Sequence, residues 1–226
     1  MTQTPVRIGI VDSGCPPGAA PVRASAAFAV EGGTLRQVPA VPDQLGHGSR
    51  VLAIIAAASP QAEFCVAQVF RERPATTPEQ VAVAIDWLVA QEVALINLSL
   101  GLRAPREVLA GACRRAIEAG VIVCAAAAAQ GDAVFPAAFP GVLRMTGDAR
   151  CGPGEIAALA GATADYGGHV RPPDGSLAGS GASMGCAHMS GHVARYLAGG
   201  GARTPAALRR WLDGVARYHG AERRRG

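Results

Sequence analysis

The sequence has few aromatic residues and no long apolar run. Phe, Trp and Tyr make up 4% of the 226 residues, whereas hydrophobic residues as a whole make up 50%. We therefore expect a core in which small aliphatic side chains pack closely. No stretch approaches the roughly 18 apolar residues of a membrane helix, and the N-terminus lacks the basic and apolar segments of a signal peptide. The sequence predicts a cytoplasmic protein without a membrane partner, a signal peptide or a propeptide.

Strong charge asymmetry and metal-ligand spacing are also missing. The formal net charge is +4, part of it in the terminal "AERRRG", and no basic patch is interleaved with aromatic residues. Nucleic acid is therefore not an expected partner. No Cys-x-x-Cys pair occurs, which argues against a zinc site and a disulfide framework, and we expect neither metal nor cofactor. Reduced, mostly buried thiols are expected at Cys15, Cys65, Cys113, Cys124, Cys151 and Cys186.

Apolar runs typical of buried strands alternate with segments typical of helices. This alternation predicts an α/β fold with a mostly parallel sheet covered by helices on both faces. Neither a repeat nor a linker divides the chain, so we expect a single domain over residues 1–226. Residues 15–45 are rich in proline, glycine and alanine, and "VPAVPDQLG" is expected to be a loop. Residues 148–180 are rich in glycine and are expected to be irregular. The expected strands are 6–11, 62–70, 93–101, 121–127 and 141–147. One expected helix begins near residue 48, and the others cover about 78–91, 105–118, 183–197 and 205–217.

One helix start is well defined. Thr77 can accept a hydrogen bond from the first turn, Pro78 suits the first helical position, and Gln80 completes a reciprocal capping box. We expect this helix to run to about Gln91.

Three residues stand where a parallel sheet gathers its functional groups. Asp12 follows the first strand, at the carboxyl edge where ligands bind in such sheets. His47 lies between two glycines directly before an apolar helix. Ser183 lies among small residues at the start of another helix, where unpaired N–H groups suit a developing anion. Together they are the set for acyl transfer, in which the Ser attacks, the His takes its proton and the Asp orients the His.

Each of these residues, taken alone, has a simpler interpretation. "DSGCPPG" after the first strand lacks the G-x-G-x-x-G spacing of a dinucleotide site, and its prolines block a helix start. A lone His is more often a surface or hydrogen-bonded core residue than a catalyst, and a Ser at a helix start is usually an N-cap. His188 and His192 have the spacing of helical metal ligands, but "HMSGH" lacks the Glu of the zinc-protease motif, so we expect a structural pair.

Five motifs follow one another between about residues 6 and 197. They are "IGIVDSG", "GHGSRVLAII", "INLSLG", "FPAAFPGVLRMTG" and "GASMGCAH", and they resemble the motifs of the subtilisin-like serine proteases, the subtilases. The resemblance implies a three-layer subtilisin-like fold with Asp12, His47 and Ser183 as a catalytic triad. It also implies that a polypeptide substrate binds as an extended strand. In that arrangement Ser99, Leu100 and Gly101 would pair with the peptide, Ala127, Ala128 and Ala129 would face them across the cleft, and Val134 would form the floor of the first specificity pocket.

Several positions depart from the family's pattern. An ungapped alignment places Gln130 where the family has its oxyanion Asn, and we expect the Gln amide to serve as the donor although it is one methylene longer. Ala182 and Ala187 replace the usual Thr and Pro of the serine motif. His47 is followed by Gly-Ser-Arg rather than Gly-Thr-His. No Asp-rich loop predicts a calcium site.

A short chain without a recognisable prosegment favours a selective processing enzyme over a digestive one. It resembles the short stand-alone subtilases that remove leader peptides during bacterial peptide or cofactor maturation, such as those of quinohemoprotein amine dehydrogenase assembly. Such an enzyme would act on a dedicated partner polypeptide. The alternative is a catalytically weak or dead subtilase fold that serves as a binding or chaperone module, which Gln130 and the altered serine motif favour.

Overall fold

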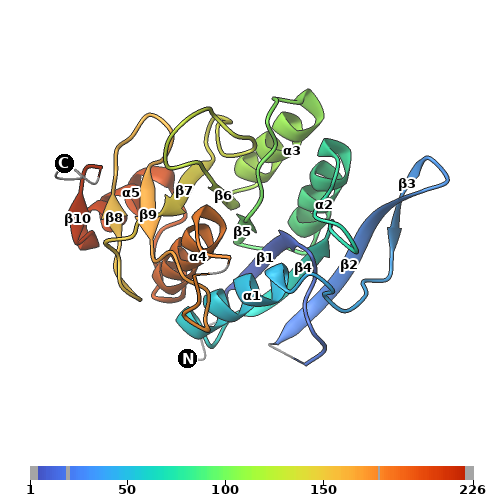
Figure 1. The fold of residues 1–226 in the computed structure, drawn as a ribbon, viewed down its shortest axis with the longest axis horizontal. Helices are drawn as coiled ribbons and strands as arrows, with labels where there is room; N and C mark the ends of the chain where they lie inside the picture. The colour runs from blue at the N-terminus through green and yellow to red at the C-terminus, as the bar shows by residue number, and fades with distance from the viewer. Residues whose placement is uncertain (1–4, 19–20, 178, 222–226) are drawn as a thin grey trace.

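The computed structural model describes residues 5–18, 21–177 and 179–221, and a ten-stranded sheet runs through them (Figure 1). The strands are β1 (Arg7–Asp12), β2 (Val22–Glu31), β3 (Thr34–Val38), β4 (Glu63–Gln68), β5 (Leu95–Leu98), β6 (Ile122–Ala126), β7 (Leu143–Gly147), β8 (Ala157–Ala158), β9 (Tyr166–Gly168) and β10 (Tyr218–His219). They lie in the order β10-β8-β9-β7-β6-β5-β1-β4-β2-β3. The pairs β2–β3 and β8–β9 are antiparallel, and the strands between β2 and β9 are joined by parallel pairing.

Helices cover both faces of this sheet, as predicted. They are α1 (His47–Ala58), α2 (Pro78–Ala90), α3 (Glu107–Glu118), α4 (Ala182–Ala198) and α5 (Pro205–Val215). Residues of α1, α4 and α5 share one apolar cluster with the sheet, and residues of α2 and α3 share another. Figure 1 shows α1 and α4 beside one another in front of the strands. The α/β architecture with three layers is therefore confirmed.

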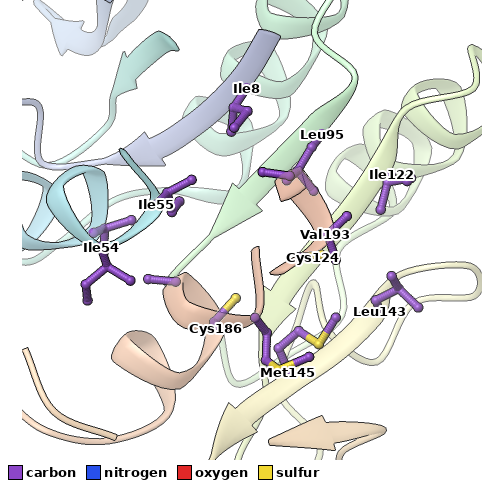
Figure 2. Packing of buried hydrophobic residues seen from close by; sticks show 14 of the residues in the cluster. Ile8, Ile54, Ile55, Leu95, Ile122, Cys124, Leu143, Met145, Cys186 and Val193 are labelled. Atoms are coloured by element: carbon purple, nitrogen blue, oxygen red, sulfur yellow. The ribbon is translucent and has the colours of Figure 1, made fainter. Parts of the chain in front are cut away.

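The core on the α1 and α4 side is built from aliphatic and sulfur-containing side chains. Ile8 and Leu95 project from β1 and β5, Met145 projects from β7, and Ile55 and Val193 meet them from the two helices (Figure 2). All five side chains are fully buried. Aromatic rings contribute little to this cluster, in agreement with the composition.

Glycine brings these layers close enough for such small side chains to fill the space. A Cβ on Gly191 of α4 would lie 2.6 Å from the Cβ of Ala58 in α1. One on Gly185, also in α4, would lie 2.2 Å from the carbonyl oxygen of Thr146 in β7. The backbone of α4 thus packs directly against its neighbours at both positions.

The predicted helix start at Thr77 is confirmed, and the other predicted strands and helices have observed counterparts. Thr77 Oγ1 accepts a hydrogen bond from the backbone N–H of Gln80 at 3.2 Å, and Gln80 Oε1 accepts one from the N–H of Thr77 at 3.0 Å. The Gln80 amide also donates to the carbonyl of Phe28 in β2 at 2.7 Å. The capping box therefore fixes α2 against the sheet as well as starting the helix.

The predicted loop "VPAVPDQLG" is confirmed from residue 39 to residue 46, between β3 and α1, but the sequence predicted none of the strands within residues 15–45. β2 and β3 form a hairpin there, and β2 also pairs in parallel with β4. Alanine-rich β2 has little intrinsic strand propensity, but burial of residues 26–29 against the rest of the fold overrides it. The overlooked signal is Gly32-Gly33, whose φ angles of 57° and 78° fit the two-residue turn of a hairpin. The segment 148–180 likewise contains the short strands β8 and β9.

The expected burial of the thiols is confirmed. All six cysteines are free, and all except Cys15 are buried. Burial raises the pKa of Cys113 and of Cys124 to about 12, so these two thiols stay protonated at neutral pH. In the part of the chain that the structure describes, no helix is long and apolar enough to cross a bilayer, and no cluster of His, Cys, Asp and Glu could hold a metal ion.

Candidate active site

Asp12 lies fully buried at the carboxyl end of β1. The strand order reverses at β1, and such a switch point opens a crevice at the carboxyl ends of the strands. Asp12 Oδ1 accepts hydrogen bonds from the backbone N–H and the hydroxyl of Ser13, at 2.7 and 3.2 Å. Gln68 at the end of β4 donates to the carbonyls of Ser13 and Val41, at 2.8 and 3.1 Å. These contacts fix the turn after β1 and orient the carboxylate.

His47 is the first residue of α1 and faces this carboxylate. Its Nδ1 lies 2.8 Å from Oδ1 and 3.0 Å from Oδ2 of Asp12. A Cβ on Gly48 would lie 2.3 Å from the carbonyl oxygen of Gly14, and the Gly48 N–H donates to the Ser13 hydroxyl at 2.9 Å. Glycine beside His47 therefore allows the start of α1 to approach the turn after β1 closely.

Asp43 shapes the loop that leads into His47. Its carboxylate accepts hydrogen bonds from the backbone N–H groups of Leu45, Gly46 and Ser49 and from the Ser49 hydroxyl, at 2.6 to 3.0 Å. Burial disfavours the charge, but these hydrogen bonds outweigh it and lower the pKa of Asp43. The loop therefore holds an ionised carboxylate close to the start of α1.

The charges around His47 favour its protonated form. The hydrogen bond to Asp12 raises the pKa of His47 above the ordinary value of 6.5, and Asp43 adds to the effect, whereas burial and the positive charge of Arg50 oppose it. About a third of the side chain, 34%, is exposed. Because Nδ1 faces Asp12, Nε2 is the nitrogen available for proton exchange with a ligand.

Ser183 lies in the first turn of α4, next to the end of β5. Its hydroxyl donates to the carbonyl of Ser99 at 3.0 Å, and the Ser99 hydroxyl donates to the carbonyl of Ser183 at 3.0 Å. Beneath this pair, the Asn97 amide donates to the Ser99 hydroxyl at 3.0 Å and accepts from Ser190 at 2.8 Å. Among the hydrogen bonds of the described residues, none joins Ser183 to His47. The polar network fixes the start of α4 on β5.

A cavity of about 590 Å³ brings together two groups of predicted site residues. Asp12 and His47 line it, and so do Ser99, Leu100 and Gly101, the predicted substrate edge. Ser183 adjoins this cavity through its contacts with Ser99. The rest of the lining is largely apolar and consists of Ser13, Leu45, Arg50, Phe70, Pro74, Ala75, Thr76 and Leu102.

Val134 lies against the predicted substrate edge. A Cβ on Gly101 would lie 3.4 Å from the Cβ of Val134. The neighbouring residues Leu102 and Phe135 exchange backbone hydrogen bonds of 2.7 and 2.9 Å. The segment around Phe135 therefore pairs with the segment that follows β5. This pairing places Val134 beside the predicted substrate edge.

The alanines at the end of β6 and just after it, residues 125–129, become gradually more exposed along the chain. Ala127 is buried, Ala128 is half-buried, and Ala129 and Gln130 are exposed. The last two residues line a second cavity of about 630 Å³, which does not include His47 or Ser99. The structure thus brings Asp12, His47 and the Ser99 edge together but does not bring Gln130 into the same cavity.

Sequence reasoning missed four residues of the site. Asp43 and Gln68 position the His47 loop, Asn97 supports Ser99, and Arg50 lines the cavity. Gln68 and Asn97 each interrupt an apolar strand, and a polar side chain buried in a strand requires hydrogen-bond partners. That interruption was the available signal. For Asp43 and Arg50 only their nearness to His47 pointed to a role.

The fold and the site define a class of protein: an α/β protein with an aspartate, a histidine and a serine near the carboxyl edge of its sheet. Within that class the chain belongs to the subtilase family, because the family model Peptidase_S8, described as "Subtilase family", matches residues 4–226.

Curated relatives support this membership. The minor extracellular protease Epr of Bacillus subtilis is 24% identical over 160 residues, which cover 65% of this chain and 24% of Epr. The subtilisin-like protease het-Q2 of Podospora anserina is 36% identical over 107 residues, covering 43% of this chain and 29% of het-Q2. The chain therefore spans less than a third of the length of these two relatives.

Solved structures share the fold. The nisin leader peptidase NisP of Lactococcus lactis superposes with a TM-score of 0.72 at 18% identity, covering 92% of this chain and 81% of NisP. A psychrophilic protease, S41, gives a TM-score of 0.68 at 20% identity, covering 92% of this chain and 82% of its own. The predicted subtilisin-like fold is confirmed.

Proposed function

We propose that the chain is a serine endopeptidase in which Asp12, His47 and Ser183 form the catalytic triad. The observation that carries the proposal is the contact between Asp12 and Nδ1 of His47, at 2.8 Å, in a cavity that reaches Ser99, the partner of the Ser183 hydroxyl. Membership of the subtilase family supports the same activity. This chemistry requires no metal or cofactor.

In the proposed mechanism the Ser183 hydroxyl first turns from the Ser99 carbonyl toward Nε2 of His47. His47 then takes the hydroxyl proton while the oxygen attacks the carbonyl carbon of the scissile peptide bond. Asp12 keeps the imidazole in the required tautomer and stabilises the imidazolium. His47 passes the proton to the leaving amine as the C–N bond breaks. A water molecule, deprotonated by His47, hydrolyses the acyl ester and restores the hydroxyl of Ser183.

We assign the oxyanion to two donors, the backbone N–H of Ser183 and the side-chain amide of Gln130. An N–H in the first turn of a helix has no acceptor within the helix and lies at the positive end of the helix dipole. Gln130 is exposed, four residues after the end of β6 at Ala126, so its amide must turn toward Ser183 when the substrate binds. Each such donor stabilises the transition state more than the ground state.

The proposed substrate is a polypeptide bound as an extended strand. Its backbone would pair with Ser99, Leu100 and Gly101, and residues 127–129 would face it from the other side. Val134, packed beside Gly101, would restrict the first specificity pocket to a small or medium apolar side chain.

We further propose a cytoplasmic role in processing one or a few partner polypeptides, such as the removal of leader peptides. NisP, which shares the fold, is by its title a leader peptidase, and we carry that substrate class over to this chain. A dedicated partner polypeptide would supply the extended segment that enters the cavity.

Incubation with a proteome-derived peptide library, followed by mass spectrometry, tests the proposed function. The wild-type protein should cleave a narrow set of sites, and cleavage should disappear in Ser183→Ala. The control Ser25→Ala removes an exposed hydroxyl of β2 and should cleave like the wild type. Absence of cleavage, or cleavage that survives Ser183→Ala, would contradict a serine peptidase. Rapid and broad digestion of casein would contradict selective processing.

A catalytically weak or dead subtilase fold is the second candidate, acting as a binding or chaperone module. It is favoured by the Ser183 hydroxyl, which donates to Ser99 rather than to His47, and by the exposed position of Gln130. Such a module would bind extended peptides with equal affinity in the wild type and in Ser183→Ala. Cleavage that depends on Ser183 would exclude it.

A further inference from the structure

Arg50 is a charged residue of the cavity that the proposed mechanism leaves unused. It lies in α1, one helical turn after His47, and lines the same cavity as His47 and the Ser99 edge. The residue is half-buried. The histidine motif of subtilases usually has Gly-Thr-His after the catalytic His. This chain has Gly-Ser-Arg there, so Arg50 places a permanent positive charge where that motif has His.

The guanidinium of Arg50 has no partner among the described residues. Its side chain makes no hydrogen bond there, and no Asp or Glu lies within ion-pair distance. Two other partly buried arginines do have carboxylate partners, Arg7 with Glu63 at 3.5 Å and Arg144 with Asp165 at 2.6 Å. A partly desolvated cation without a counter-ion is unfavourable unless a ligand supplies the negative charge.

The position of the guanidinium is set by the segment that leads into Ser183. A Cβ on Gly179 would lie 2.4 Å from Nη1 of Arg50, so the guanidinium passes directly over this glycine. Gly179 also has a φ of 80°, which favours glycine. Arg50 thus bridges the gap between α1, which carries His47, and the segment four residues before Ser183. The positive charge therefore lies between the helix that carries His47 and the segment that leads into Ser183, at the wall of the cavity that both His47 and Ser99 line.

Electrostatic effects on neighbouring groups agree with this placement. The charge of Arg50 lowers the pKa of His47, against the larger effect of the Asp12 hydrogen bond. Hydrogen bonds from Ser176 lower the pKa of Asp174, and Arg50 adds to that effect. Asp174 is fully exposed, however, so water and salt screen it and it is a poor counter-ion.

We propose that Arg50 binds a carboxylate group of the peptide substrate next to the scissile bond. The inference rests on the proposed peptidase function and specifies its substrate class. Guanidinium suits this role because its planar fork donates two parallel hydrogen bonds to the two oxygens of a carboxylate. The carboxylate is either the side chain of an Asp or Glu or the C-terminal carboxylate of the peptide.

Peptide pairs test the proposal. From the sites cleaved in the library, peptides are made with Asp or Glu near the scissile bond and with Asn or Gln in its place. The wild type should cleave the acidic member of a pair about tenfold or more faster, in kcat/KM, than the amide member. In Arg50→Gln this ratio should fall to near one, and in Arg50→Glu peptides with Lys should be preferred. The control Arg210→Gln removes an exposed charge of α5 and should keep the wild-type ratio.

Libraries with free and with amidated C-termini distinguish the two sources of the carboxylate. A C-terminal carboxylate would give cleavage at a fixed distance from the C-terminus, and amidation would abolish it. An acidic side chain would give an Asp or Glu at a fixed position in both libraries. The same acid-to-amide ratio in wild type and Arg50→Gln, in both libraries, would overturn the proposal.

Binding provides a readout that does not require turnover. Immobilised Ser183→Ala should retain acidic peptides from the library, and the double variant with Arg50→Gln should retain acidic and amide peptides equally. Equal retention by Ser183→Ala itself would overturn the role of Arg50 even if the protein cleaves peptides. Loss of Ser183-dependent cleavage together with selective retention of acidic peptides would instead contradict the peptidase function alone.

Discussion

Nearby charges have opposite effects on the pKa of the His47 imidazole. Asp12 and Asp43 raise this pKa, and Arg50 lowers it. A general base acts only in its neutral form. Because the hydrogen bond to Asp12 raises the pKa of His47, the neutral base becomes available only at a higher pH than for an ordinary histidine. The charges near one ring therefore set the pH range in which the proposed enzyme works.

We expect kcat/KM to rise with pH through a pKa above 6.5. Arg50→Gln removes a cation that favours neutral His47, so the pKa increases further and the acid limb should move to higher pH. Profiles of kcat/KM against pH, measured with one peptide for both proteins, give this shift. An unchanged limb, or a shift to lower pH, would contradict the electrostatic coupling. Arg210→Gln should leave the limb in place.

Gln130→Ala tests the second oxyanion donor. If the amide turns toward the oxyanion, turnover should fall by about tenfold or more, with a smaller change in KM, because the contact forms mainly in the transition state. Steady-state kinetics with the best library peptide measures both quantities. Gln130→Asn shortens the side chain by one methylene and should retain more turnover than Gln130→Ala. Equal turnover in the wild type and in Gln130→Ala would leave the oxyanion to backbone donors.

At the residue scale, the sequence predicted Asp12 and His47 as partners, and their contact is observed. The glycines beside His47 and the turn after β1 permit the close approach, and hydrogen bonds of Asp43 and Gln68 then hold the loop that carries His47. The sequence did not predict the Ser183 rotamer, which depends on the Ser99 carbonyl 84 residues away. Nor did it predict the unpaired state of Arg50, because the absence of a counter-ion is a property of the folded surroundings.

At the scale of single elements, the position of α4 decides where Ser183 lies. Gly185 lets this helix contact the backbone of β7, and Gly191 leaves room for the Ala58 side chain of α1. Asn97 and Ser99 then fix its first turn on β5. The nucleophile is thus placed by backbone contact along the helix and by a buried polar network at its start.

Gly185→Ala should destabilise the protein and reduce reactivity at Ser183. The added Cβ would lie 2.2 Å from the carbonyl oxygen of Thr146, and such overpacking costs about 1–3 kcal/mol. Urea unfolding measures the loss. The control Gly214→Ala in α5 has no atom within 4 Å of the new Cβ, so it should be neutral or stabilising, since alanine is the better helix former. Equal stability of the two variants would contradict the proposed close packing of α4.

The elements also show where sequence patterns were sufficient. The start of α2 was predictable because Thr77, Pro78 and Gln80 act within one turn. The strand β2 was not, because its alanines become strand residues only when β4 and α2 bury them. For the same reason the two-residue strands β8 and β10 carry no sequence signal of their own, since they exist through pairing with neighbours.

At the scale of the whole molecule, Asp165 connects three parts of the fold. Its carboxylate accepts hydrogen bonds from the backbone and the side chain of Arg144 in β7 and from Arg209 in α5. Burial disfavours the charge of Asp165, but the bonds from Arg144 and the charge of Arg209 outweigh it and lower the pKa. The sheet and the last helix are thereby joined on the side of the molecule away from β3.

Asp165→Asn should lower the free energy of unfolding by about 2 kcal/mol at neutral pH. Because the folded pKa lies below the ordinary value of 3.8, this stabilisation is complete above about pH 4 and is lost as the pH falls through the folded pKa. The difference between the two proteins should therefore shrink in strong acid. Unfolding measured across pH tests this, and a difference that persists at the lowest pH would contradict it. The exposed pair Asp86–Arg115 supplies the control Asp86→Asn, with little expected change.

The order of the five motifs was enough to predict the architecture of the whole molecule, because each motif marks a strand end or helix start of the same sheet. Gly32-Gly33 signals the hairpin at one sheet edge, but the parallel pairing of its first strand with β4 and the shape of the cavity were not predictable. The cavity depends on the loop carrying Pro74, Ala75 and Thr76, which contains no motif, and on contacts between segments far apart in the chain.

Covalent labelling tests whether Asp12, His47 and Ser183 act together on an acyl group. The protein is incubated with a fluorophosphonate, and the adduct is located by peptide mass spectrometry. We expect one adduct, on Ser183, that forms much more slowly in His47→Ala and is absent in Ser183→Ala, while Ser25→Ala reacts like the wild type. Failure of Ser183 to react, or reaction at an unchanged rate in His47→Ala, would contradict the claim.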